Sequence, residues 1–282
     1  MKGRLTVALF FLSTFVFAGD GEEPGFFQRP NRENRENGFY FFWGYNRASF
    51  TKSNIHVHGP EYEFTVYNVV AHDRPTPATD EAYYNPKFFT IPQFNFRLGY
   101  IINPKWAVSI GWDHMKYVMD DGQIAELSGY INHPTNTNYN GTYLRQPTKL
   151  TPDLFKFEHT DGLNVTSIDV ERTFTLWSGK RHLFSLHSVT GLGTGVVIPR
   201  SDVRVVGVGL NNHWNVAGYH LNAKTGIRFE FLRNGFFQLE SRAGYINLPN
   251  VLIQNDKAHR IDHHFFFLEG YAVIGMFLKV KK

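Results

Sequence analysis

Residues 219–231 read YHLNAKTGIRFEF, and their side chains alternate in character along the whole stretch. The odd positions are apolar or small, from Tyr219 and Leu221 to Phe231, whereas the even positions carry polar or charged groups or glycine. Successive side chains of a β-strand point to opposite faces, so this period of two predicts a strand with one apolar and one polar face. A soluble sandwich can contain such a strand, and the segment alone leaves the fold class open.

The same alternation recurs in segments long enough to cross a bilayer as tilted strands, which takes roughly 9 to 11 residues. The eight segments are residues 39–50, 89–101, 106–118, 164–177, 182–197, 219–231, 236–248 and 265–278. Arg172 interrupts the apolar face of its segment. No stretch after the N-terminus offers the 18 or more uncharged apolar residues of a membrane helix, and the mean hydropathy is only −0.31.

The connections between these segments alternate between short and long. The short ones are rich in Asn, Gly and Pro and cover residues 102–105, 178–181 and 232–235, whereas the long ones cover residues 53–87, 120–162, 198–213 and 249–261. Bacterial outer-membrane barrels have short periplasmic turns and long external loops. The sequence therefore predicts an all-β, transmembrane, antiparallel up-and-down barrel of about eight strands with both termini in the periplasm.

The N-terminus has the features of an export signal. Two positive charges precede the apolar stretch 5–17, and small residues follow at Ala18 and Gly19. We expect residues 1–18 to be a signal peptide cleaved near Ala18, residues 19–37 to be a flexible segment, and residues 38–282 to form the barrel. Within the first two long loops, the alternating stretches 62–71 and 122–131 are expected to extend the sheet as hairpins.

Composition excludes several classes of function. The chain contains no cysteine, so disulfides, thiol chemistry and lipid attachment through a cysteine are ruled out. A formal net charge of only +4 over 282 residues argues against a nucleic-acid partner.

In its architecture, the chain resembles the small outer-membrane barrels of the OmpA, OmpX, OmpW and PagL type over residues 38–279, without a family-specific motif. Such barrels commonly end on an aromatic residue used by the assembly machinery, whereas here Phe277 is followed by five further residues. The resemblance implies outer-membrane lipid, lipopolysaccharide and the barrel assembly machinery as partners. It implies no oligomeric state.

A barrel of about eight strands is only wide enough for its own side chains, so an open pore is not expected. The inward-facing positions mix both signs of charge, and such charges in a narrow lumen must pair. We predict an ion-pair network that plugs the barrel, with a proton or ion path as the alternative. Its ten members are Arg97, Asp113, Asp169, Glu171, Lys224, Arg228, Glu230, Glu240, Arg242 and Glu269.

Polar groups also gather near the external ends of the strands, where Ser, His and a carboxylate could assemble a hydrolase triad. The weak candidates are His72, Asp73, Asp113, His114, Ser201 and Asp202. The His-x-Ser element expected of a PagL-like deacylase has no matching context, because His187 and Ser188 are adjacent and point to opposite faces. The competing interpretation is that these groups cap strand ends and contact lipopolysaccharide phosphates.

Thirteen histidines raise the question of a metal site. His56 and His58 share one strand face, and a His-x-His pair can ligate zinc or copper. Spacing identifies no third ligand, so no metal and no cofactor are predicted.

The sequence favours a structural, adhesive or ligand-binding role carried by the surface loops. Two alternatives remain: an outer-leaflet lipid A or phospholipid hydrolase, and a small channel for hydrophobic compounds. A lipocalin-like soluble barrel is the alternative fold. The direction in which the apolar side chains point distinguishes it from a membrane barrel. A membrane barrel requires Phe94, Ile227 and Leu268 to face outward, with the charged side chains of Arg97, Arg228 and Glu269 inside.

Overall fold

The computed structural model describes residues 35–85, 87–88, 91–179, 184–209, 213–232 and 234–278. The expected signal peptide and most of the expected N-terminal segment lie outside these residues. Among the residues described, no helix has the length and apolar character needed to cross a membrane.

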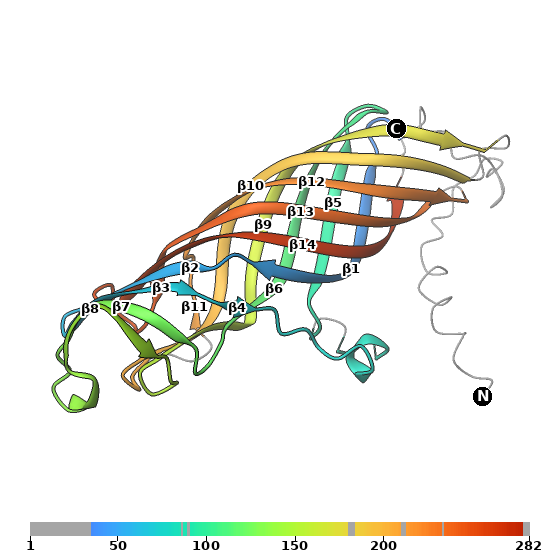
Figure 1. Cartoon of the computed structure of the whole chain (residues 1–282). Helices are drawn as coiled ribbons and strands as arrows, with labels where there is room; N and C mark the ends of the chain where they lie inside the picture. The colour runs from blue at the N-terminus through green and yellow to red at the C-terminus, as the bar shows by residue number, and fades with distance from the viewer. Residues whose placement is uncertain are drawn as a thin grey trace.

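Eight antiparallel strands close into a ring (Figure 1). They are β1 (Phe39–Phe50), β5 (Phe94–Ile101), β6 (Trp106–Met119), β9 (Phe155–Ser178), β10 (Phe184–Val205), β12 (Gly218–Phe231), β13 (Gly235–Leu252) and β14 (Arg260–Leu278). The first and last strands pair along the whole length of β1, from Phe39 opposite Leu278 to Phe50 opposite Phe267. The predicted eight-stranded antiparallel barrel is confirmed.

The two ends of the barrel differ, as the connection lengths predicted. The turn end holds the short connections, the start of β1 and the end of β14. The loop end holds the long connections and lies on the opposite side of the barrel (Figure 1).

Several strand bounds differ from the predicted ones, mostly at the loop end. Residues 89 and 90 of the strand predicted from residue 89 lie outside the described residues, and residues 91–93 are not in a strand. β5 begins at Phe94, just after Pro92, which has no N–H to donate to a ladder. At the loop end, β9, β10, β13 and β14 all run beyond their predicted limits. Those limits followed the apolar outward face, which ends at the bilayer, whereas backbone pairing continues beyond it.

Four further strands extend the sheet at the loop end. In order from β14 they are β2 (Ser53–Gly59), β3 (Tyr62–Val69), β7 (Ile124–Ile131) and β8 (Gly141–Lys149). The predicted hairpin stretches 62–71 and 122–131 correspond to β3 and β7, which also pair with each other. Two short strands complete the loop end: β4 (Ala71–His72) pairs with β6, and β11 (His213–Trp214) pairs with β10. Two 3-10 turns, η2 (Glu81–Tyr83) and η3 (Thr137–Tyr139), lie in the connections.

The orientation of the side chains is that of a membrane barrel. Ile227 and Leu268 are 45% and 52% exposed on the outer wall, and Phe94 is half-buried. On the inside, Arg97 and Glu269 have no exposed surface. A soluble barrel would bury its apolar face, so the outward belt of large apolar side chains excludes that alternative.

Arg172, which interrupted the apolar pattern, points to the outer wall near the turn end. Its guanidinium lies over the rings of Trp106 and Phe174, at 5.2 Å and 4.8 Å from their centroids. A cation over aromatic faces at the edge of the belt keeps its charged group close to water.

The interior is filled in three tiers. At the turn end, an aromatic cluster closes the ring around Tyr40, Phe42 and Phe236. The charged side chains occupy the middle. At the loop end, a larger apolar core joins the extended strands to the barrel through residues such as Val57, Phe155 and Phe157.

Candidate functional site

The ten predicted lumen residues all point into the barrel, and none is more than 5% exposed. At the centre, two guanidinium groups share the same pair of carboxylates. Arg97 and Arg242 each contact both Asp113 and Asp169, with Arg97 Nη2 3.2 Å from Asp113 Oδ2 and Arg242 Nη2 3.4 Å from Asp169 Oδ1. Burial of one such charge without its partners would be strongly unfavourable, so the four side chains stabilise one another.

A second group lies beside this centre. The Lys224 ammonium is 2.7 Å from Glu171 Oε1 and 3.7 Å from carboxylate oxygens of Asp169 and Glu240. Glu171 also accepts hydrogen bonds from the Tyr40 hydroxyl at 2.6 Å and the Ser109 hydroxyl at 2.7 Å. The carboxylate is therefore surrounded by donors.

Toward the turn end, the network meets the aromatic tier. Arg228 Nε donates to Gln238 Oε1 at 2.6 Å, and its guanidinium lies 4.6 Å from the Phe236 ring centroid. Glu230 pairs with Arg35 at 2.7 Å. Although Arg35 lies in the expected N-terminal segment, its side chain is buried at this end of the barrel.

Neutral side chains complete the network. Ser167 accepts hydrogen bonds from both central arginines, at 3.1 Å from Arg97 and 3.0 Å from Arg242. Asn95 donates to Glu269 at 2.9 Å. These neutral side chains occupy the same inward positions of the alternation, but the predicted network included only charged residues. Gly111 makes room: a Cβ there would lie 2.8 Å from the Arg97 guanidinium.

The six triad candidates do not converge. His72 pairs with Asp120 at 2.6 Å, and Asp73 accepts a hydrogen bond from the backbone of Ala48. His114 contacts Asn164 at 2.7 Å. Asp113 belongs to the lumen network, so its assignment to the rim is wrong; its place in the alternation turns it inward, below the rim.

Ser201 and Asp202 are adjacent but engage different groups. The Ser201 hydroxyl is 2.8 Å from Nδ1 of His159, and Asp202 pairs with Lys156 at 2.5 Å and with Arg204 at 3.1 Å. His159 is fully buried, with the ring of Phe157 4.9 Å away. A triad needs a carboxylate on the second ring nitrogen and access for substrate, and the described surroundings of His159 supply neither.

A groove of about 780 Å³ lies on the outer wall, across β1, β14, β13 and β12. Its outward-facing lining forms two rows in register across these strands, one of Arg47, Gly270, Ser241 and Thr225 and the other of Tyr45, Ala272, Leu239 and Ile227. Gly270 has no atom within 4 Å of the position its Cβ would take, so the floor of the groove is open there.

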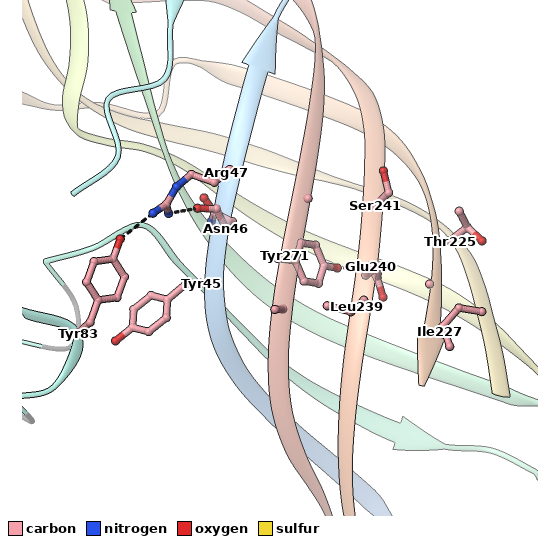
Figure 2. Close-up of a pocket in the computed structure, with 13 residues that line it drawn as sticks. Tyr45, Asn46, Arg47, Tyr83, Thr225, Ile227, Leu239, Glu240, Ser241 and Tyr271 are labelled. Carbon is pink, nitrogen blue, oxygen red and sulfur yellow. Dashed lines mark hydrogen bonds between the residues drawn. The ribbon is translucent and has the colours of Figure 1, made fainter. Parts of the chain in front are cut away.

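Arg47 and Tyr83 stand on one side of this groove, with Thr225 and Ile227 on the other (Figure 2). Arg47 Nη2 donates to the Tyr83 hydroxyl at 2.9 Å, and the Tyr83 ring packs edge-on against Tyr45 at 4.8 Å. Arg47 follows the last outward aromatic residue of β1, at the edge of the apolar belt. The Arg47 guanidinium and the hydroxyl groups of Tyr45 and Tyr83 lie beside the apolar row of the groove. Such an arrangement suits the headgroup and the acyl chain of a lipid.

Comparisons with known proteins give fold-level likeness alone. No family model matches the chain, and no curated protein matches its sequence. Among solved structures, the outer membrane protein OprG from Pseudomonas aeruginosa is 8% identical, with a TM-score of 0.42, and the match covers 88% of this chain and 99% of that one.

Two further solved structures are similar over comparable lengths. Neisserial surface protein A is 10% identical, with a TM-score of 0.32 and coverage of 86% of this chain and 97% of that one. The attachment invasion locus protein Ail of Yersinia pestis is 12% identical, with a TM-score of 0.27 and coverage of 84% and 99%. All three are outer-membrane or surface proteins at low sequence identity, and nothing about the function of this chain follows from them.

Proposed function

We propose that this protein is a closed outer-membrane barrel that conducts no ions and anchors a rigid β-sheet platform, formed by β2, β3, β7 and β8, for binding at the cell surface. A closed antiparallel barrel with an apolar belt leaves no backbone group unpaired in lipid, which is the solution that outer-membrane proteins use. By the same rule, short turns face the periplasm, and the loop end faces outward.

The observation that carries this proposal is the filling of the lumen along its length. The aromatic tier, the ion-pair network and the apolar core follow one another from the turn end to the loop end. An ion crossing the barrel would have to break buried ion pairs and then pass through apolar packing, and both steps are costly.

The binding role is supported by the construction of the loop end. Strands β2, β3 and β7 contribute side chains to the apolar core, so the platform is held in place instead of being a set of free loops. Its outer strands expose apolar groups, with Leu144 85% and Ile124 74% exposed. In this proposal, these exposed apolar side chains contribute to the binding surface.

The two alternatives have less support. For a hydrolase, the candidate Ser, His and Asp side chains would have to meet, and the described residues hold them with separate partners. For a hydrophobic-compound channel, the lumen would have to open, and the groove beside Arg47 lies on the outer wall instead.

Planar-bilayer recordings test the closed lumen. We expect the full chain, reconstituted in its folded state, to give no discrete single-channel currents. Insertion is verified beforehand by heat-modifiable migration on a gel and by co-flotation with lipid. Reproducible unitary currents from the folded protein would contradict the proposal and favour the channel.

Single-cysteine labelling tests the outward display. The chain contains no cysteine, so each introduced thiol is unique. On intact cells, a membrane-impermeant maleimide should label Leu144→Cys, which lies on β8 at the loop end. The matched control Lys105→Cys lies exposed in the β5–β6 turn and should react only after the outer membrane is permeabilised. The reverse labelling pattern would place the platform in the periplasm.

A further inference from the structure

Strand β2 presents two histidines on the outer face of the platform. His56 and His58 point outward, whereas Ile55 and Val57 between and beside them are fully buried in the apolar core. β2 is hydrogen-bonded to β14 on one side and to β3 on the other. The two imidazoles therefore project from a backbone that is held on both sides.

The neighbouring strands bring carboxylates to the same place. Glu63 on β3 lies opposite His58 in the register, and its Oε1 is 3.7 Å from Nε2 of His56. Asp262 on β14 lies opposite His56, and its Oδ2 is 2.9 Å from Nε2 of His58. The rings of His56 and His58 stack with centroids 4.1 Å apart.

We propose that His56, His58 and Glu63 bind a divalent transition-metal ion at the cell surface, with Asp262 positioned to supply a fourth ligand. The donor atoms of the first three residues all lie within 4.8 Å of one another. In a tetrahedral zinc site with bonds of about 2.0–2.1 Å, ligand atoms are about 3.4 Å apart, so small side-chain rotations bring these donors into place.

The donor set identifies the class of ion. Two imidazoles with carboxylates suit zinc and copper, whereas calcium and magnesium prefer sites made of oxygen ligands. Imidazole binds a metal only when it is neutral.

Two other histidines of the protein also pair with carboxylates and can be compared with the β2 group. His72 pairs with Asp120 at 2.6 Å, and His259 pairs with Asp256 at 2.9 Å, each with a single imidazole. Within the part of the chain that the structure describes, the β2 group is the one in which three potential ligands meet. The inference concerns the outer face of the platform and does not depend on whether the lumen is closed.

Isothermal titration of the folded, tag-free protein with zinc chloride in detergent micelles tests the site. We expect one zinc ion per chain, with the affinity reduced by at least about tenfold in His56→Gln, His58→Gln and Glu63→Gln. The matched control His72→Gln removes an exposed histidine from a His–Asp pair and should leave the affinity unchanged. Heat-modifiable migration confirms that each variant is folded.

Two results would overturn the inference. The first is the absence of saturable zinc binding to the folded wild-type protein. The second is zinc binding that survives His56→Gln and His58→Gln undiminished, since it would then take place elsewhere on the surface. Either result leaves the proposed closed lumen and the proposed outward display of the platform unaffected, because those two proposals do not involve the β2 histidines.

Discussion

Replacement of Arg242 by methionine is expected to lower the free energy of unfolding by about 3–5 kcal/mol. The Arg242 guanidinium is fully buried and contacts both central carboxylates, Asp113 and Asp169. Methionine fills much of the same space but leaves these carboxylates with one cation fewer. Removal of one partner from a buried ion pair costs far more than the net contribution of the pair itself, because the remaining charge stays desolvated.

Urea unfolding in lipid vesicles, followed by tryptophan fluorescence, measures this effect. The control is Arg145→Met, which removes an arginine that pairs with Glu126 at 2.9 Å on the platform surface. Because both partners are about half exposed, this pair should contribute no more than about 1 kcal/mol. Equal losses in the two variants would mean that the lumen charges are hydrated, and that water, not pairing, fills the barrel.

The membrane-spanning part of the fold could be predicted from the sequence because lipid imposes a simple rule. Outward residues in the belt are mostly apolar and are rarely charged, so the alternation in residues 219–231 also indicates which face looks inward. The same rule placed Arg97 and Glu269 in the lumen before their partners were known. The exception, Arg172, lies at the edge of the belt, where the rule is weakest.

Beyond the bilayer the rule no longer applies, and there the sequence was less informative. At the loop end the inside becomes apolar, as at Val57 and Phe157, and pairing between strands distant in sequence decides which residues meet. The third metal ligand shows the difficulty. Glu63 reaches His56 through the β2–β3 register, which spacing within one strand does not reveal.

The triad candidates lie apart for a related reason. Side chains that lie near the same rim need not meet in a triad, because the rim of a barrel is wide and each polar group there can pair with a local partner. His72, His114 and Ser201 each do so on different strands. The pairing of Ser201 with His159 could be suspected only from the long extensions of β9 and β10, which lie beyond the apolar belt.

Introduction of arginine at Leu192 is expected to lower the free energy of unfolding by about 2–4 kcal/mol, the cost of such a charge at the middle of a bilayer. Leu192 is 68% exposed on the outer wall of β10, and its neighbours in the sheet are Val170 and Ala223. Urea unfolding in lipid vesicles gives the measurement. Leu144→Arg is the control, because Leu144 is even more exposed but lies on the platform, and its change should be within about 0.5 kcal/mol.

The contrast between these two leucines isolates the effect of lipid from that of exposure. Both side chains are open to their surroundings, so neither substitution fills a cavity or breaks a packed core, and the difference in stability reports the medium around each site. Arg172 shows why depth matters: near the turn end its cation rests on aromatic rings, whereas an arginine at position 192 would have apolar neighbours on both adjacent strands. If the two variants lost the same stability, the belt would be facing water, and the membrane-spanning interpretation would fail.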